Sequence, residues 1–308
     1  MKLLRLIKHK NLLLLALMQL VFRYGFLELQ NIPLSLADWQ YALLVLSTVC
    51  IAAGGFVINT IFDTEIASND NSEKIVIGKD FTESFAYNLY VSFTFIGVSI
   101  GFYLSNVIQR PNFAILFILI AATLYLYATS LKQSLLIGNI IISLLLSLSI
   151  LIIGLFDLLP ATYEGNQPRM GLLFSILIDY AIFIFTIAFI REIVKECQRY
   201  AEDSGRTFNT LPTIFGIKTT PKIIFALSFI PIFFVFYYVN EYLLPGNLII
   251  SILYGLIFIA SPLIYFTVKI GVAKEPKDFH HLSTILKWVL FFGILSILVI
   301  NLNMKHNA

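Results

Sequence analysis

The sequence predicts an all-α integral membrane protein, a bundle of nine transmembrane helices. Of its 308 residues, 58% are hydrophobic and only 13% are charged, whereas soluble domains carry about a quarter charged residues. The deficit of charge extends over the whole chain, which argues against a soluble domain held by one anchor. The apolar runs show no period-two alternation, so helices rather than a β-barrel are indicated.

Nine apolar segments are long enough to cross a bilayer, for which a helix needs about 20 residues. They lie near 11–30, 39–61, 84–106, 112–130, 136–157, 170–191, 221–242, 247–268 and 285–303. The basic N-terminus resembles a signal peptide but has no small-x-small cleavage site, so we interpret the apolar run after it as the first span. We therefore expect residues 1–308 to form a single polytopic transmembrane domain.

The basic residues are unevenly divided between the two sets of connections. Of the 21, one (Arg23) lies within a span and three (Arg110, Arg169 and Lys305) lie on the second side. The other 17 lie on the first side. Of these, 14 are in the N-terminus and the connections 61–83, 131–135, 192–220 and 269–284, and three (Arg191, Lys222 and Lys287) are at the adjoining ends of spans. Because cytoplasmic loops carry the excess of Lys and Arg, we expect the N-terminus in the cytoplasm and the C-terminus outside an inner or plasma membrane.

Two classes of function are excluded at this stage. The net charge of +3 is too small to indicate a nucleic-acid partner. The two cysteines, Cys50 and Cys197, are far apart and have no partner at metal-ligand spacing, so neither a disulfide framework nor a zinc site is indicated.

Ten of the 18 acidic residues gather in two stretches, six of them at 63–83 and four at 192–203. Both stretches are predicted at the same membrane face, and carboxylates together with the oxygens of a phosphorylated substrate are the ligands that Mg²⁺ prefers. The alternative is two ordinary solvated loops. In that case the carboxylates pair with basic residues, namely Lys74, Lys79, Arg199 and Arg206.

Both acidic stretches contain longer motifs. Residues 54–66 read GGFVINTIFDTEI and residues 73–79 read EKIVIGK; together they resemble Asn-Asp-x-x-Asp-x-x-x-Asp, the first signature of the UbiA family of intramembrane prenyltransferases. Residues 191–203 begin REIVKE and are followed by TLPTIFG at 210–216. These resemble the second acidic segment, especially that of the archaeal-type, lipid-synthesising branch.

The resemblance runs in order over nearly the whole chain. Residues 127–132 and the pair Gly138-Asn139 are similar to the family's connection between spans four and five. The family has nine spans, which is the number predicted from the apolar segments. The resemblance therefore implies the UbiA prenyltransferase fold.

The family's activity is the ionisation of an allylic diphosphate, assisted by Mg²⁺, followed by attack of an acceptor on the carbocation. The resemblance implies Asp63 and Asp203 as catalytic residues, and Asp63, Glu196 and Asp203 as metal ligands. It implies a diphosphate site made by Asn59, Lys74, Lys79, Tyr127, Lys132 and Arg199. The partners implied are a prenyl diphosphate and a lipid-soluble or interfacial acceptor within the membrane lipid, and the lipid-branch motifs favour an acceptor of glycerol-phosphate type.

The acidic signatures of this chain contain fewer carboxylates than the family pattern. Thr60 and Ala67 stand at carboxylate positions of the first, and Arg199 stands at one of the second. The remaining pairs Asp63/Asp70 and Glu196/Asp203 are seven residues apart, about 10.5 Å along a helix. Neither pair can hold one ion alone if its helix continues, so a metal would need carboxylates from both stretches.

Arg199 lies between Glu196 and Asp203, which leaves two interpretations open. It is either a salt bridge that neutralises those acids, or a guanidinium that binds diphosphate directly and partly replaces a metal.

Two charged residues lie well inside predicted spans, away from their ends: Arg23 in the first and Asp179 in the sixth. An unpaired charge in hydrocarbon is unfavourable, so we expect them to pair with each other or to serve the acceptor.

Three other classes of function remain open. They are a prenyltransferase fold that cyclises its substrate, a non-catalytic isoprenoid-binding membrane protein, and a secondary transporter. The last is disfavoured by the lack of an internal repeat.

Overall fold

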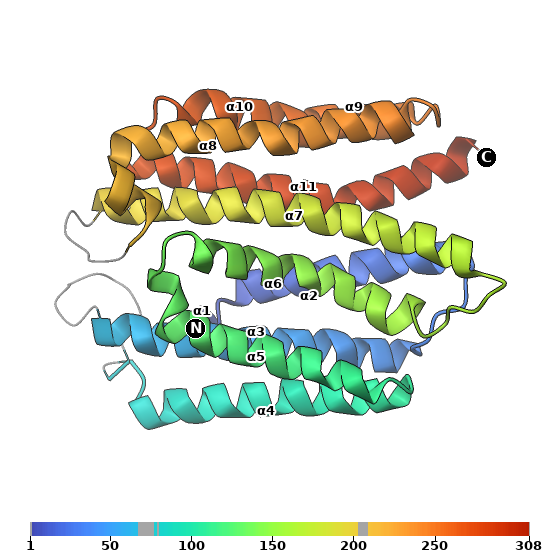
Figure 1. The fold of residues 1–308 in the computed structure, drawn as a ribbon, viewed down its shortest axis with the longest axis horizontal. Coiled ribbons are helices and arrows are strands. Elements are labelled where there is room, and N and C mark those ends of the chain that lie inside the picture. Colours follow the sequence, from blue (N-terminus) through green and yellow to red (C-terminus); the bar gives the residue numbers. More distant parts are fainter. Residues whose placement is uncertain (1, 67–76, 79, 203–208, 308) are drawn as a thin grey trace. The chain divides into compact units, whose positions relative to one another are not determined.

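The computed structural model describes residues 2–66, 77–78, 80–202 and 209–307, and within these ranges most of the chain is helical (Figure 1). The α-helices are α1 (Lys2–Leu6), α2 (His9–Phe22), α3 (Asp38–Ile66), α4 (Glu83–Val107), α5 (Ala114–Thr129), α6 (Ile137–Ile153), α7 (Gln167–Glu202), α8 (Leu211–Tyr238), α9 (Ile249–Gly255), α10 (Ser261–Ile270) and α11 (Pro276–Asn307). Four π-helical segments continue or connect them: η1 (Arg23–Leu27), η5 (Gly154–Leu158), η6 (Val239–Leu243) and η7 (Leu256–Ala260). The 3₁₀ turns are η2 (Glu28–Gln30), η3 (Pro111–Phe113) and η4 (Leu131–Gln133).

Nine helical segments within the described ranges are long and apolar enough to cross a membrane. Each coincides with one of the nine segments predicted from hydropathy, and the protein is therefore a multi-pass membrane protein. Several of these spans combine an α-helix with a π segment, as α2 with η1 and α9 with η7 and α10.

The predicted connection over 192–220 is wrong in extent. The helix α7 continues to Glu202 and α8 begins at Leu211, so most of the second acidic stretch is helical. The reason is an apolar face that continues beyond the predicted end of the span, where Ile193, Val194 and Cys197 are buried. A helix with such a face is stabilised by packing although its other face is charged.

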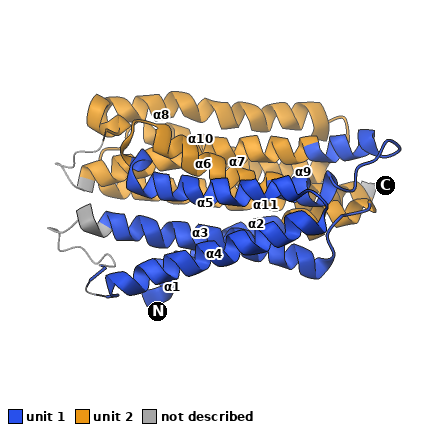
Figure 2. Ribbon diagram, turned by 60° about the horizontal axis from the view of Figure 1, so that its bottom comes forward, with its two compact units in different colours: residues 1–20, 33–132, 152–174 blue, residues 21–32, 133–151, 175–308 orange. Residues whose placement is uncertain are grey.

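The chain forms two compact units, which are coloured in Figure 2 and described separately. Unit 1 consists of residues 1–20, 33–132 and 152–174, and unit 2 of residues 21–32, 133–151 and 175–308. The single transmembrane domain predicted for residues 1–308 stays a prediction.

In unit 1, α3 packs closely against α4 because glycines face the contact. The hydroxyl of Ser47 donates a hydrogen bond of 2.7 Å to the carbonyl oxygen of Gly97. A Cβ at Gly97 would lie 2.6 Å from Cγ1 of Ile51 and 2.9 Å from the carbonyl oxygen of Ser47. Small residues at such contacts let helix backbones approach in a membrane, where hydrophobic burial supplies little driving force.

In unit 2, the helix α8 contains a break at Gly216. This residue has φ 75° and ψ 165°, a region that is essentially restricted to glycine. Downstream, the hydroxyl of Thr220 donates to the carbonyl oxygen of Gly216 at 3.0 Å. The break separates the short turn that follows the second acidic stretch from the long apolar part of α8.

Candidate active site

The first part of the candidate site lies at the C-terminal end of α3 in unit 1. Asn59 and Asp63 are one helical turn apart, and the side-chain amide of Asn59 donates a hydrogen bond of 2.7 Å to Oδ2 of Asp63. The amide oxygen of Asn59 is buried and accepts no hydrogen bond from the described residues. Two oxygen-bearing side chains of the first signature therefore lie next to each other.

Lys132 lies beside the same carboxylate. It belongs to the turn η4 that follows α5, and its ammonium group lies 2.8 Å from Oδ1 of Asp63. The side chain of Lys132 is 9% exposed and that of Asp63 is 55% exposed. Asp63 is thus held between a neutral donor and a cation, each on a different carboxylate oxygen.

Aromatic side chains of α3, α4 and α5 contact one another next to this group. The ring of Tyr125 stacks on that of Tyr90 at a centroid distance of 6.3 Å and meets Phe62 edge-on at the same distance. Tyr127, predicted to bind diphosphate, is half-buried on α5 two residues further along. Unit 1 therefore places a carboxylate and a cation at the end of an aromatic surface.

The second part of the candidate site lies on α7 in unit 2. Glu196 is only 7% exposed, and its Oε2 accepts no hydrogen bond of standard geometry from the described residues. Its electrostatic neighbours are Arg199, the side chain of Asn139, Glu192 and the backbone of Leu211. A buried carboxylate oxygen that accepts no hydrogen bond is unfavourable unless a further donor or a cation reaches it.

Glu192, one turn before Glu196, has a partner. The ammonium of Lys195 lies 2.6 Å from its Oε1, and a guanidinium nitrogen of Arg191 lies 4.0 Å from the same oxygen. The Nε of Arg191 also donates to the carbonyl oxygen of Ser283 on α11 at 3.1 Å. These contacts connect the end of α7 to α11.

Arg199 is exposed on the same helix. Its Nε donates to the carbonyl oxygen of Lys195 at 3.4 Å, and its charge acts on both Glu192 and Glu196. It makes no ion pair within 4.0 Å to either of them. The interpretation of Arg199 as a salt bridge to Glu196 is therefore not supported. A salt bridge to Asp203 stays untested, because Asp203 lies outside the described residues.

Several predicted site residues are outside the described ranges, namely Lys74, Lys79 and Asp203. Asp63 belongs to unit 1 and Glu196 to unit 2, and each is described with the neighbours of its own unit. Among the described residues, no three His, Cys, Asp or Glu side chains form a group that could hold a metal. The predicted set of metal ligands stays a prediction.

The sequence did not assign two residues that contribute to this part of the chain. Asn139 approaches Glu196, and Arg191 bonds to the backbone at Ser283. Both are polar residues at the edges of apolar segments, and both lie within stretches that resemble the family. Their polarity and their place in these stretches could have marked them as candidates, but only the folded structure identifies their partners.

The nine apolar helices of the described residues, with a carboxylate and an ammonium group paired at the end of α3, are the features of a membrane-embedded protein with a charged site. The chain belongs to the UbiA prenyltransferase family, whose model matches residues 24–299. It is a prenyltransferase of that family, as its acidic signatures indicate.

Curated relatives support the same family. The chain is 30% identical over 289 residues to digeranylgeranylglyceryl phosphate synthase of Saccharolobus solfataricus, covering 91% of this chain and 88% of the relative. The protein of the same name from Sulfurisphaera tokodaii is 32% identical over 219 residues, which are 69% of this chain and 71% of the relative.

Solved structures of the family share the fold. A structure of digeranylgeranylglyceryl phosphate synthase matches with a TM-score of 0.63 at 21% identity, covering 97% of both chains. A UbiA homologue from Archaeoglobus fulgidus, bound to DMAPP and Mg²⁺, matches with a TM-score of 0.59 at 17% identity, covering 96% of this chain and 99% of the other. At these identities the likeness concerns the fold.

Proposed function

We propose that this prenyltransferase transfers a prenyl group from an isoprenoid diphosphate to a lipid acceptor of glycerol-phosphate type, in a reaction that depends on Mg²⁺. The observation that carries the proposal is the carboxylate of Asp63 held between Asn59 and Lys132 at the end of an aromatic surface. The acceptor class is supported by the relatives named digeranylgeranylglyceryl phosphate synthases.

The residues present suit a hard cation. Mg²⁺ prefers oxygen ligands and is commonly bound by one or two carboxylates together with substrate phosphates. Asp63 supplies an exposed carboxylate, and the neighbouring amide oxygen of Asn59 is buried without a hydrogen bond. In unit 2, the buried Oε2 of Glu196 is similarly left without one. Bound Mg²⁺ would neutralise charge that develops on the departing diphosphate.

Lys132 has two roles in this proposal. In the free protein its ammonium balances the charge of Asp63, at 2.8 Å. When a diphosphate is bound, the same group binds its oxygens, because an ammonium beside a phosphate forms a strong charge-assisted hydrogen bond. Lys132 thereby orients the leaving group beside the Asp63 carboxylate. Lys74, Lys79 and Tyr127 are proposed as further diphosphate ligands from the family resemblance.

From the second acidic stretch, we propose Glu196 and Asp203 as metal ligands and Arg199 as a diphosphate ligand. Glu196 is buried on α7, and the side chain of Asn139 is one of its electrostatic neighbours. Arg199 is exposed and makes only a weak bond to its own helix, so its guanidinium is available to an anion.

The aromatic residues of unit 1 are proposed to line the path of the prenyl group. The faces of Tyr90 and Tyr125, stacked on each other, carry negative π density. Such faces stabilise a nearby cation by about 0.5–2 kcal/mol, which suits an allylic carbocation. The path is proposed to open toward the cytoplasmic face, in keeping with the predicted orientation of the N-terminus.

The proposal is tested by converting Asp63 to Asn. The purified protein is incubated with Mg²⁺ and radiolabelled prenyl diphosphates, with and without a glycerol-phosphate-type acceptor, and release of diphosphate is measured. We expect Asp63→Asn to lose activity by at least about tenfold, since removing a charged group at a reacting centre forfeits well over 1 kcal/mol.

The matched control is Glu164→Gln, which removes an exposed carboxylate of the same unit that lies outside both acidic stretches. Its activity should stay near that of the wild type. Release of diphosphate by the wild type only when the acceptor is present supports transfer over cyclisation. Binding of prenyl diphosphate without any release would contradict the proposal and favour an isoprenoid-binding protein.

A further inference from the structure

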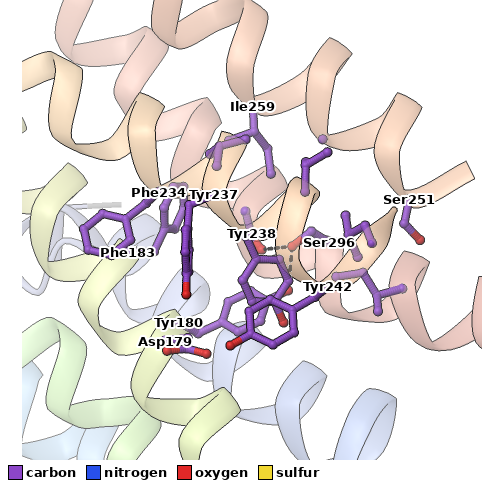
Figure 3. A pocket seen from close by; sticks show the side chains of 16 residues that line it. Asp179, Tyr180, Phe183, Phe234, Tyr237, Tyr238, Tyr242, Ser251, Ile259 and Ser296 are labelled. Atoms are coloured by element: carbon purple, nitrogen blue, oxygen red, sulfur yellow. Dashed lines mark hydrogen bonds between the residues drawn. The ribbon is translucent and has the colours of Figure 1, made fainter. Parts of the chain in front are cut away.

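Unit 2 contains a pocket with a cavity volume of about 130 Å³, lined mainly by aromatic and aliphatic side chains, with one carboxylate among them (Figure 3). The carboxylate is that of Asp179 on α7, and the rings come mainly from the end of α8 and from η6. In Figure 3 the carboxylate lies near Tyr180, and the hydroxyl ends of Tyr237 and Tyr242 point to the same side of the pocket. The aromatic lining consists of Tyr180, Phe183, Phe234, Tyr237, Tyr238 and Tyr242.

Asp179 has no counter-charge within the described part of the chain. It forms no ion pair and no hydrogen bond there, although it lies in a membrane span. No ion pair joins Asp179 to Arg23 in the described part of the chain, and the guanidinium of Arg23 lies over the ring of Tyr24 at 5.7 Å from its centroid. An ionisable residue within a span that lacks a structural partner is unfavourable unless it serves a ligand or an ion.

The rings around Asp179 are held in place by their own contacts. The hydroxyl of Tyr180 bonds to that of Ser296 at 2.8 Å, and its ring meets Phe22 edge-on at 4.9 Å. The rings of Tyr238 and Tyr242 are 4.8 Å apart, and both lie within electrostatic range of the Asp179 carboxylate. The pocket therefore offers a carboxylate among fixed aromatic faces without rearrangement.

We propose that this pocket binds the ammonium group of an organic cation, which is either a membrane amphiphile or a small water-soluble cation. The carboxylate of Asp179 supplies the opposite charge, and the ring faces supply cation–π attraction, the combination by which quaternary ammonium groups are bound. A neutral ligand would leave the carboxylate uncompensated, and an anion would be repelled by it.

The pocket is separate from the second acidic stretch. Asp179 precedes Glu196 by 17 residues on the continuous helix α7, a distance of about 25 Å along the axis. On α8 and η6 the pocket reaches Tyr242, close to the turn before α9. The proposed cation site is thus independent of the proposed diphosphate chemistry and goes beyond prenyl transfer.

The test compares a cation with its neutral isostere. The full chain in an uncharged maltoside detergent is titrated calorimetrically with choline and with 3,3-dimethyl-1-butanol, which has the same shape without the charge. A second titration uses dodecyltrimethylammonium. Binding of choline would show that a small water-soluble cation is enough to occupy the pocket. Binding of dodecyltrimethylammonium alone would show that the ligand is a membrane amphiphile. Failure of both to bind, or equal binding of the neutral isostere, overturns the proposal.

Two variants connect the binding to the pocket. Asp179→Asn should weaken binding of the cation by about tenfold or more, since tenfold corresponds to 1.4 kcal/mol. Glu241→Gln removes a carboxylate from the same η6 segment that does not line the pocket and should leave affinity unchanged. Equal affinity of Asp179→Asn and wild type would contradict the proposal.

The aromatic contribution is tested at an exposed ring, so that folding is preserved. Tyr242→Phe keeps the ring face and should bind as the wild type does, whereas Tyr242→Leu should lose severalfold in affinity. Thermal unfolding of each variant without ligand checks that the fold is retained. A loss of affinity in Tyr242→Phe equal to that in Tyr242→Leu would overturn the cation–π part of the proposal.

Discussion

The ammonium of Lys132 lies 2.8 Å from the carboxylate of Asp63, and the cation is the buried member of the pair. The two residues are 69 positions apart in the chain and belong to the turn after α5 and to the end of α3. Because Lys132 is the buried residue, removing the carboxylate of Asp63 leaves its ammonium group with poor access to water. This is more unfavourable than removing Lys132, which leaves the exposed carboxylate of Asp63 without its partner.

Lys132→Met should raise the KM for prenyl diphosphate by about tenfold or more, because a hydrogen bond to a charged group contributes about 1.5–3 kcal/mol. Lys132→Arg should retain part of the affinity, since the charge is kept in a different geometry. Steady-state kinetics at saturating Mg²⁺ measures both. Lys10→Met, an exposed lysine of the same unit, is the control, and an unchanged KM in Lys132→Met would remove Lys132 from the site.

Gly97→Ala should destabilise unit 1 by about 1–3 kcal/mol, the usual effect of overpacking. The new Cβ would meet Ile51 and the backbone of Ser47, neither of which can withdraw without separating α3 from α4. Gly171→Ala is the control, because nothing lies within 4 Å of a Cβ at that position and alanine is the better helix former. Thermal unfolding in detergent should show a lower midpoint for Gly97→Ala alone.

Much of the fold was predictable because hydrocarbon allows few structures. A chain inside a bilayer must form the hydrogen bonds of its backbone internally, and it therefore folds into helices. For this reason the length of the apolar segments was enough to predict all nine spans found in the described residues. The end of α7 was missed because Arg191, Glu192 and Lys195 interrupt the hydropathy. Their helical turn is stabilised by salt bridges and by a buried apolar face, which a hydropathy average does not detect.

The candidate site was predictable in its residues but not in its pairings. The signature identified Asn59 and Asp63, and the family resemblance identified Lys132, yet no sequence pattern predicts that Lys132 neutralises Asp63. That contact depends on how α5 packs beside α3. The tyrosine pocket at Asp179 was missed for a related reason, because aromatic residues are common in spans and only folding gathers them around one carboxylate.

Chemical labelling should place the two acidic stretches at the same face of the membrane. In a background without Cys50 and Cys197, single cysteines replace Glu83, Asn209 and, on the opposite face, Glu164. A membrane-impermeant thiol reagent added outside intact cells should label the Glu164→Cys protein alone, as the excess of basic residues beside the other two positions predicts. Labelling of only one of the Glu83→Cys and Asn209→Cys proteins would place the stretches on opposite faces.

Arg199→Asp should weaken binding of a prenyl diphosphate, because it places a negative charge where an exposed guanidinium stands beside Glu196. The expected loss is about 2–5 kcal/mol, the usual range when one partner of a charged hydrogen bond is lost. Calorimetric titration with a non-hydrolysable prenyl diphosphate analogue, with and without Mg²⁺, measures it. Lys218→Asp makes the same change of charge at an exposed position on α8 and is the control.

Restoring the acidic signatures distinguishes a diphosphate ligand from a weakened metal site. If the substitutions in this chain only weakened metal binding, the triple change Thr60→Asp, Ala67→Asp and Arg199→Asp should raise Mg²⁺ affinity and turnover together. If Arg199 binds diphosphate, the triple variant should still bind the analogue more weakly than Thr60→Asp with Ala67→Asp alone. We expect the second result, because Arg199 has no ion pair to Glu196 or Glu192 that would otherwise explain its charge at this position. Unchanged affinity in Arg199→Asp, with and without Mg²⁺, would leave it a surface residue without a role in binding.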